Sequence, residues 1–157
     1  MEKSKRKQAL IAGISLIIMA VAAIFAYGYV FPQVEVPANP LATWDQLTEN
    51  TSLYMAGLAG WLIIFITDIL VTFSLFYFFR GTHKNLSMLT AATRFVYTII
   101  LGIAIGWLFS LLPFQNGKDI DSIQAGTQVL IAMDNFRKIW SVGLIIFGLH
   151  LLGLGYL

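Results

Sequence analysis

Long blocks of apolar residues constrain this chain more than any other feature. The block Ala9–Phe31 contains one plainly polar side chain, Ser15. The block Leu53–Phe79 contains a single charged residue, Asp68, and the block Phe95–Leu112 contains none. Each reaches the roughly 18 to 20 residues that a helix needs to cross about 30 Å of hydrocarbon. The sequence therefore predicts three membrane-spanning helices in these blocks.

A fourth apolar block extends from Ile139 to Leu157 and is interrupted only by Ser141 and His150. Only 11% of the residues are charged, whereas a soluble domain carries about a quarter. We predict an all-α, polytopic transmembrane helix bundle with four membrane-spanning helices, forming one domain over residues 1–157. The expected helices cover residues 8–31, 52–79, 86–113 and 138–157, with outer surface segments at 32–51 and 114–137. Because the fourth block has no basic flank, we expect the natural protein to continue beyond Leu157.

The distribution of charge predicts the orientation. Basic residues precede the first block and follow the second, whereas the loop between them carries only acidic ones: Lys3, Lys5, Arg6, Lys7, Arg80 and Lys84 against Glu35, Asp45 and Glu49. Short loops rich in Lys and Arg stay cytoplasmic, so the amino terminus is expected inside. A cleaved signal peptide is the competing interpretation, but its apolar core would span about 7 to 15 residues, fewer than this first block.

The two outer segments carry local signals. Thr43 to Gln46 has the spacing of a capping box, which predicts a short surface helix beginning there. The first long helix is expected to end at Phe31–Pro32, and Pro113 with Asn116–Gly117 is expected to close the third. Residues 119–138 are polar and mildly amphipathic, which predicts a helix on or near the outer surface, with continuity into the fourth helix left open.

Two charged residues, Asp68 and Arg94, lie within or beside the apolar blocks on neighbouring antiparallel helices. A lone charge at membrane depth costs a few kcal/mol, so a partner is expected and we predict an intramembrane pair. The alternative is that Arg94 extends its side chain to the inner interface. Asp68 would then be protonated or bonded to a neighbour such as Thr72.

His150 lies midway along the fourth block and is a candidate intramembrane polar site. A hydrogen bond between helices is the simplest role for it. A proton relay, a haem ligand and a general base for Ser15 are alternatives, but the other histidine, His83, lies in a loop. The chain has no cysteine and no His-Glu-x-x-His, phosphate-binding or nucleic-acid motif. We therefore predict no catalytic, cofactor-binding or metal-binding residue and no cofactor.

Small residues recur at four-residue spacing inside the blocks, where they let helix backbones approach each other. Packing within one chain is the expected role, and a homo-oligomer contact is the alternative. The residues are Gly102 and Gly106, Ala56 and Gly60, and Ala9 and Gly13.

Two segments resemble a known family. Residues Thr93 to Tyr97 followed by Ile99 to Gly102, and above all Phe147 to Leu157, are similar to an uncharacterised bacterial multi-pass membrane protein family, the domain of unknown function number forty-three eighty-six. The resemblance covers nearly the whole chain and implies about six helices in a full-length member. Arg94 and His150 match family positions, and no activity or cofactor is implied.

The sequence thus favours a non-enzymatic, multi-pass protein of the bacterial plasma membrane. Its expected partner is the lipid bilayer, with no nucleic acid and no small-molecule ligand indicated. The alternative is a small transporter or proton-coupled carrier that uses Asp68, Arg94 and His150, because ionisable groups inside a bilayer are often functional.

Overall fold

The structure is a computed structural model, and it describes residues 2–112 and 121–157. Every regular element in these ranges is helical, and four helices are long and apolar enough to cross a membrane. The all-α bundle with four such helices is therefore confirmed. The elements are α1 (Glu2–Ala23), η1 (Ile24–Val30), α2 (Phe31–Val34), α3 (Pro40–Glu49), α4 (Thr51–Phe79), α5 (Lys84–Phe109) and α6 (Ser122–Gly155).

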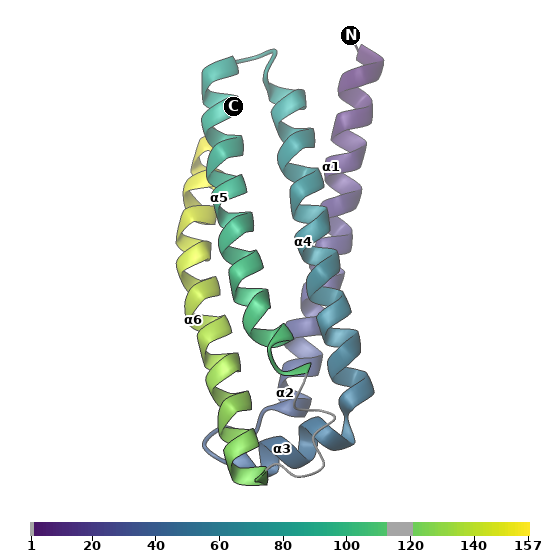
Figure 1. Cartoon of the computed structure of the whole chain (residues 1–157). Helices are drawn as coiled ribbons and strands as arrows, with labels where there is room; N and C mark the ends of the chain where they lie inside the picture. Colours follow the sequence, from purple (N-terminus) through teal and green to yellow (C-terminus); the bar gives the residue numbers. More distant parts are fainter. Residues whose placement is uncertain (1, 113–120) are drawn as a thin grey trace.

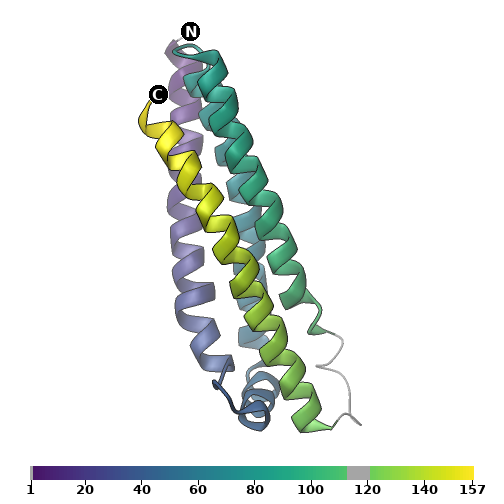
Figure 2. The ribbon, with the colours of Figure 1, turned by 90° about the vertical axis from the view of Figure 1, so that its left-hand side faces the viewer.

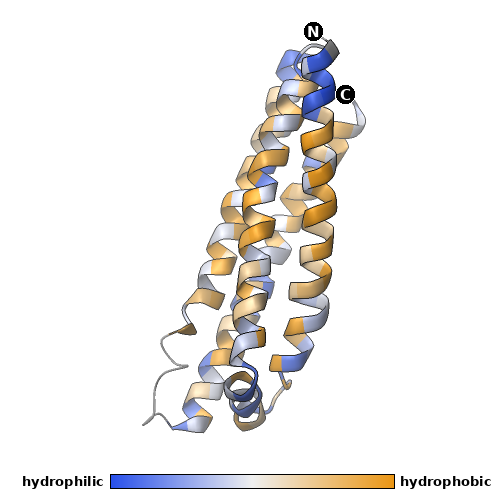
Figure 3. Ribbon diagram, turned by 90° about the vertical axis from the view of Figure 1, so that its right-hand side faces the viewer, coloured by the Kyte–Doolittle hydropathy of each residue, from blue (hydrophilic) through white to orange (hydrophobic). Residues whose placement is uncertain are grey.

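The long helices lie side by side, and the short helix α3 lies across one end of the bundle (Figures 1 and 2). We call this the α3 end. The amino terminus and the turn between α4 and α5 lie at the opposite end, where Figure 3 shows a concentration of hydrophilic residues. We call it the basic end, for residues 3–7 and 80–84. The Lys5 ammonium group lies 3.6 Å from the position of a Cβ on Gly81, so these two segments meet.

The first long helix differs from its predicted bounds. It runs without interruption from α1 through η1 into α2, so it passes the expected end at Phe31–Pro32 and reaches Val34. The segment η1 is π-helical and ends at Val30, two residues before Pro32, which stands in the first turn of α2. Proline lacks the backbone N–H that regular α-helical bonding needs, and a wider π turn accommodates such a disturbance. Proline thus alters the helix here without ending it.

The predicted short helix exists, but the capping box at Thr43 was wrong. Helix α3 begins at Pro40, and the side chain of Asn39 caps it by accepting from the Ala42 N–H at 3.1 Å. Proline is favoured at the first helical position and Asn at the cap, so this pair fixes the start earlier. Thr43 already lies inside the helix, where its hydroxyl accepts from the Val36 N–H at 3.0 Å.

The second outer segment is helical, as predicted, and it is continuous with the fourth long helix, which the sequence had left open. Residues from Ser122 onward belong to α6, which continues without a break to Gly155. Asp121 caps this helix by accepting from the Ile123 N–H at 3.0 Å. Helix α5 ends at Phe109, four residues earlier than predicted. The predicted stop signals at Pro113 and Asn116–Gly117 lie outside the described residues.

An aromatic cluster extends from the interior of the bundle to its surface toward the α3 end. It consists of Tyr27, Phe31, Trp61, Phe136 and Trp140, contributed by η1, α2, α4 and α6. Neighbouring ring centroids lie 4.6 to 6.4 Å apart, mostly in tilted or edge-to-face arrangements. Such geometries are favoured by the charge distribution of aromatic rings and bury large apolar areas.

Hydrophobic residues occur along most of the length of the long helices (Figure 3). Large hydrophobic side chains are exposed on every long helix, among them Ile17, Ile24, Ile66, Phe73, Ile103, Ile145 and Leu152. Soluble monomers rarely expose contiguous apolar patches of more than a few hundred Å². The exposed apolar side chains on all the long helices indicate contact with a lipid bilayer.

Candidate functional site

A buried ion pair joins α4 to α5. The Arg94 guanidinium donates through Nη2 to Oδ1 of Asp68 at 2.5 Å, and the two side chains are 1% and 0% exposed. Asp68 lies 11 residues before the end of α4 at Phe79, which places it about 16 Å along the helix axis. The structure therefore brings together the two residues for which the sequence suggested a pair. Their burial leaves no path for Arg94 to extend to an interface.

The other carboxylate oxygen of Asp68 accepts a hydrogen bond from the Thr98 hydroxyl. Thr98 lies four residues after Arg94, so both side chains project from the same face of α5. Thr72, the alternative partner considered for Asp68, instead donates to the backbone carbonyl of Asp68 at 2.9 Å. Sequence reasoning missed Thr98, although a polar residue one turn from a buried charge on the same helix was the available signal.

His150 connects α6 to this pair. Its Nδ1 lies 2.8 Å from the carbonyl oxygen of Thr90, and its Nε2 lies 3.2 Å from Nη1 of Arg94. A carbonyl oxygen can only accept and a guanidinium can only donate, so Nδ1 carries the proton and Nε2 accepts. His150 is therefore neutral in this arrangement. We call Asp68, Thr90, Arg94, Thr98 and His150 the charge network.

The charge network carries no net charge. One carboxylate and one guanidinium neutralise each other, and the guanidinium also lies over the ring of Phe147, 5.2 Å from its centroid. Removing a buried charge from water costs several kcal/mol, which only close pairing and further hydrogen bonds offset. Two polar atoms here have no hydrogen-bond partner among the described residues, Arg94 Nε and Thr90 Oγ1.

Neither a metal ion nor a serine nucleophile fits this arrangement. The Arg94 guanidinium lies between Asp68 and His150 and would repel a cation placed between them. Within residues 2–112 and 121–157, no group of three His, Cys, Asp or Glu side chains is close enough to hold a metal ion. Both ring nitrogens of His150 are bonded to α5, whereas Ser15 is a buried residue of α1.

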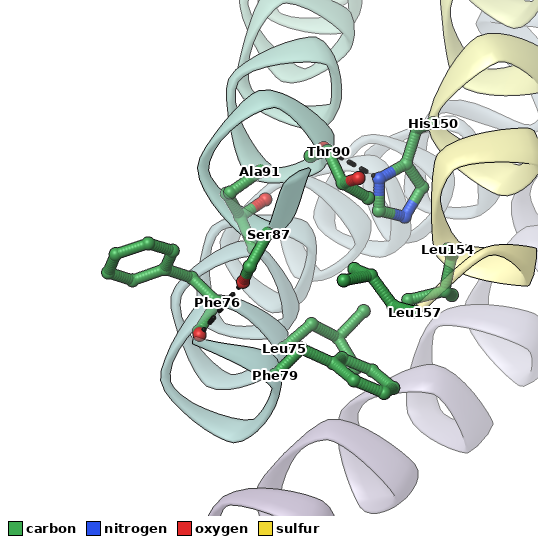
Figure 4. A pocket seen from close by; sticks show the side chains of 10 residues that line it. Leu75, Phe76, Phe79, Ser87, Thr90, Ala91, His150, Leu154 and Leu157 are labelled. Carbon is green, nitrogen blue, oxygen red and sulfur yellow. Dashed lines mark hydrogen bonds between the residues drawn. The ribbon is translucent and has the colours of Figure 1, made fainter. Parts of the chain in front are cut away.

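A small pocket adjoins the charge network on the side of the basic end (Figure 4). Its lining extends from Phe79, the last residue of α4, to the imidazole of His150, and includes Ser87 and Thr90 of α5. The space open to the centre of a water molecule is about 10 Å³, enough for about one water. Thr90 is one of the lining residues and is 4% exposed, and its hydroxyl has no hydrogen-bond partner among the described residues.

The predicted small residues divide into two groups. A Cβ on Gly60 would lie 3.1 Å from Cβ of Ala26, and one on Gly102 would lie 3.0 Å from the ring of Phe65. These two pack within the chain. A Cβ on Gly106 would have nothing within 4 Å, and Ala56 is exposed.

Closer approaches occur at glycines that the four-residue pattern did not identify. A Cβ on Gly57 would lie 2.8 Å from Val30, and one on Gly153 would lie 2.6 Å from the Thr90 hydroxyl oxygen. At Gly126 it would lie 1.8 Å from the carbonyl oxygen of Pro40, where α3 crosses α6. These contacts depend on the neighbouring element, which the spacing of small residues along one helix does not reveal.

The comparisons with known proteins identify a family but assign no activity. A family model described as "Domain of unknown function (DUF4386)" matches residues 11–157. No curated protein and no solved structure matches the chain.

Proposed function

We propose that this chain, which belongs to the DUF4386 family, is a non-enzymatic, multi-pass protein of the bacterial plasma membrane. In this proposal the charge network is a neutral polar tie that holds α4, α5 and α6 together within the bilayer. The observation that carries it is the mutual bonding of Asp68, Arg94 and His150, each no more than 1% exposed. In this arrangement the three ionisable groups bond to one another, so none is free for chemistry on a substrate.

The orientation in this proposal follows from the basic end. Lys5 of the amino-terminal segment lies against the turn that contains Arg80 and Lys84. Cytoplasmic segments of membrane proteins are enriched in Lys and Arg, which supports an inside position for both. Because the chain has no cysteine, single cysteines at Asn39 and Thr82 can be labelled without background. Labelling of Asn39→Cys from outside intact cells, without labelling of Thr82→Cys, is expected, and the reverse pattern would overturn the orientation.

Lipid is the partner that this proposal requires. The exposed faces of the long helices supply only apolar side chains over much of their length. The small residues that do not pack within the chain, such as Ala56 and Gly106, also lie on these faces, where lipid or a second copy of the chain would contact them. Cross-linking of Ala56→Cys in membranes distinguishes the two: a dimer band supports a homo-oligomer, and its absence supports lipid contact.

A second candidate function is a small proton-coupled carrier. The observation that favours it is the pocket that reaches His150 from the basic end. Proton relays in membranes use ionisable side chains that face the bundle interior.

Purified protein in liposomes that contain a pH-sensitive dye distinguishes the two candidates. A polar tie predicts no proton flux above that of protein-free liposomes, for wild type and for Asp68→Asn alike. A carrier predicts a flux that Asp68→Asn abolishes. Correct folding of both proteins should first be verified by circular dichroism and by a single elution peak in detergent.

A further inference from the structure

The pocket beside His150 has the features of a binding site for water and protons. Thr90 and His150 line it together from α5 and α6, and Figure 4 shows the imidazole at its wall beside the Thr90 side chain. The Thr90 hydroxyl is buried and has no partner among the described residues. We propose that this pocket holds a water molecule bound by the Thr90 hydroxyl, and that protons reach His150 through it from the basic end.

The shape of the pocket supports access from that end. Leu75, Phe76 and Phe79 line it from the last turns of α4, and Ser87 lines it from the first turn of α5. Arg94, Asp68 and Thr98 do not line the pocket; they are at most 2% exposed and lie behind His150, which contacts Arg94. The charge network therefore separates the pocket from the α3 end. A proton that enters the pocket meets His150 before any other ionisable side chain of the network.

His150 is also the member of the network that can accept a proton. Arginine stays protonated in proteins, and both oxygens of Asp68 accept hydrogen bonds, from Arg94 and Thr98. Imidazole titrates nearest to neutral pH among the ordinary side chains. Nε2 is the unprotonated ring nitrogen of His150, and its lone pair accepts a hydrogen bond from Nη1 of Arg94.

Protonation would change one contact of the network. Once the contact between Nε2 and Nη1 of Arg94 opens, a hydronium ion transfers its proton to Nε2, a new N–H bond forms, and neutral water remains in the pocket. Nε2 then becomes a donor, so it can no longer accept from Nη1 of Arg94, and two positive charges face each other. The bond from Nδ1 to the Thr90 carbonyl is unaffected. The charged groups around His150 are Arg94 on α5 and, beyond it, Asp68 on α4, whose carboxylate partly balances the added charge.

The proposed protonation of His150 does not depend on proton transport, because a residue that binds a proton can regulate a protein without carrying protons across the membrane. We therefore test it at His150 itself. His83→Gln leaves His150 as the single histidine, so selective ¹⁵N labelling gives the signals of one ring. Solid-state NMR in bilayers then measures the transfer of magnetisation from water to the ring nitrogens. Strong transfer and conversion to the doubly protonated ring at lower pH are expected, and no transfer from water would overturn the proposal.

Pocket variants make the test specific. Thr90→Val keeps the backbone carbonyl and nearly the same volume but removes the hydroxyl, so water transfer to His150 should fall several-fold. Ala91→Leu should have the same effect because it fills the pocket. The matched control is Ala92→Leu, since Ala92 is exposed and does not line this pocket. An unchanged water signal in both pocket variants would contradict the assigned water site, whatever the flux assay shows.

Sidedness is the last arm of the experiment. In liposomes with the protein in one orientation, the pH is changed on one side only. The His150 signals should follow the pH at the basic end, and signals that follow the α3 end would overturn the assigned route.

Discussion

The charge network and the aromatic cluster both hold the bundle together, but they do so by different physics. In the aromatic cluster the ring pairs favour tilted and edge-to-face geometries, but each ring has several neighbours, so no single contact is required. In the charge network most polar atoms have one partner, and each bond has a defined donor and acceptor. When one aromatic contact is lost, the other ring contacts still hold the cluster together. Loss of one charge leaves its partner buried and unpaired.

This difference matters for the membrane setting. Apolar packing gains little from the exclusion of water when the surroundings are lipid, so packing contacts must compete with lipid tails of similar polarity. A buried ion pair has no such competitor, since lipid cannot satisfy either charge. The charge network should therefore set which faces of α4, α5 and α6 meet, while the aromatic cluster fills the space that this choice creates.

The largest expected effect comes from removing one charge. Arg94→Gln leaves the Asp68 carboxylate buried without a counter-ion, which costs about 3–5 kcal/mol in comparable pairs. Reversible unfolding in mixed micelles with added denaturant measures the loss. Arg80→Gln is the matched control, because Arg80 is exposed and lies over the ring of Tyr77 only. Similar losses for the two variants would mean that Arg94 contributes no more to stability than an exposed arginine does.

The second-largest loss of stability is expected from a steric clash at the contact between α3 and α6. A Cβ at Gly126 would lie 1.8 Å from the Pro40 carbonyl oxygen, a backbone atom that cannot rotate away. Overpacking of this kind costs about 1–3 kcal/mol, so Gly126→Ala should lower the unfolding free energy by that amount. Gly106→Ala serves as the control, since nothing lies within 4 Å of its Cβ position. It should be neutral or slightly stabilising.

A substitution within the aromatic cluster should lower the unfolding free energy by less than Arg94→Gln or Gly126→Ala does. Phe136→Leu keeps an apolar side chain of similar size at a fully buried position, and such swaps usually cost less than about 1.5 kcal/mol. The same unfolding assay checks this value. A loss as large as that of Arg94→Gln would show that the cluster, too, depends on single contacts, and the proposed contrast would fail.

The smallest effect is expected at the ion pair between Arg137 and Glu35 near the α3 end. These side chains are 34% and 13% exposed, and partly exposed pairs contribute about 0–1 kcal/mol. Glu35→Gln should therefore cost little, and the cost should fall further when salt is added. A loss that does not depend on salt would indicate a buried role for this pair.

The sequence predicted the parts of this fold that follow from composition and from one helix at a time. Four apolar helices were predictable because block length alone decides them. A partner for Asp68 was predictable because a lone buried charge is costly. The convergence of His150 on the same pair was not, since it depends on the rotation of α6 against α5. The pocket and the contact at Gly126 depend on tertiary packing in the same way.

The double-mutant cycle of Asp68 and Arg94 tests the central claim most directly. Asp68→Asn and Arg94→Gln each leave one charge unpaired, whereas the double variant leaves none. We predict that the double variant loses at least about 2 kcal/mol less unfolding free energy than the sum of the single losses. Losses that add within error would contradict it, because the two residues would then act independently.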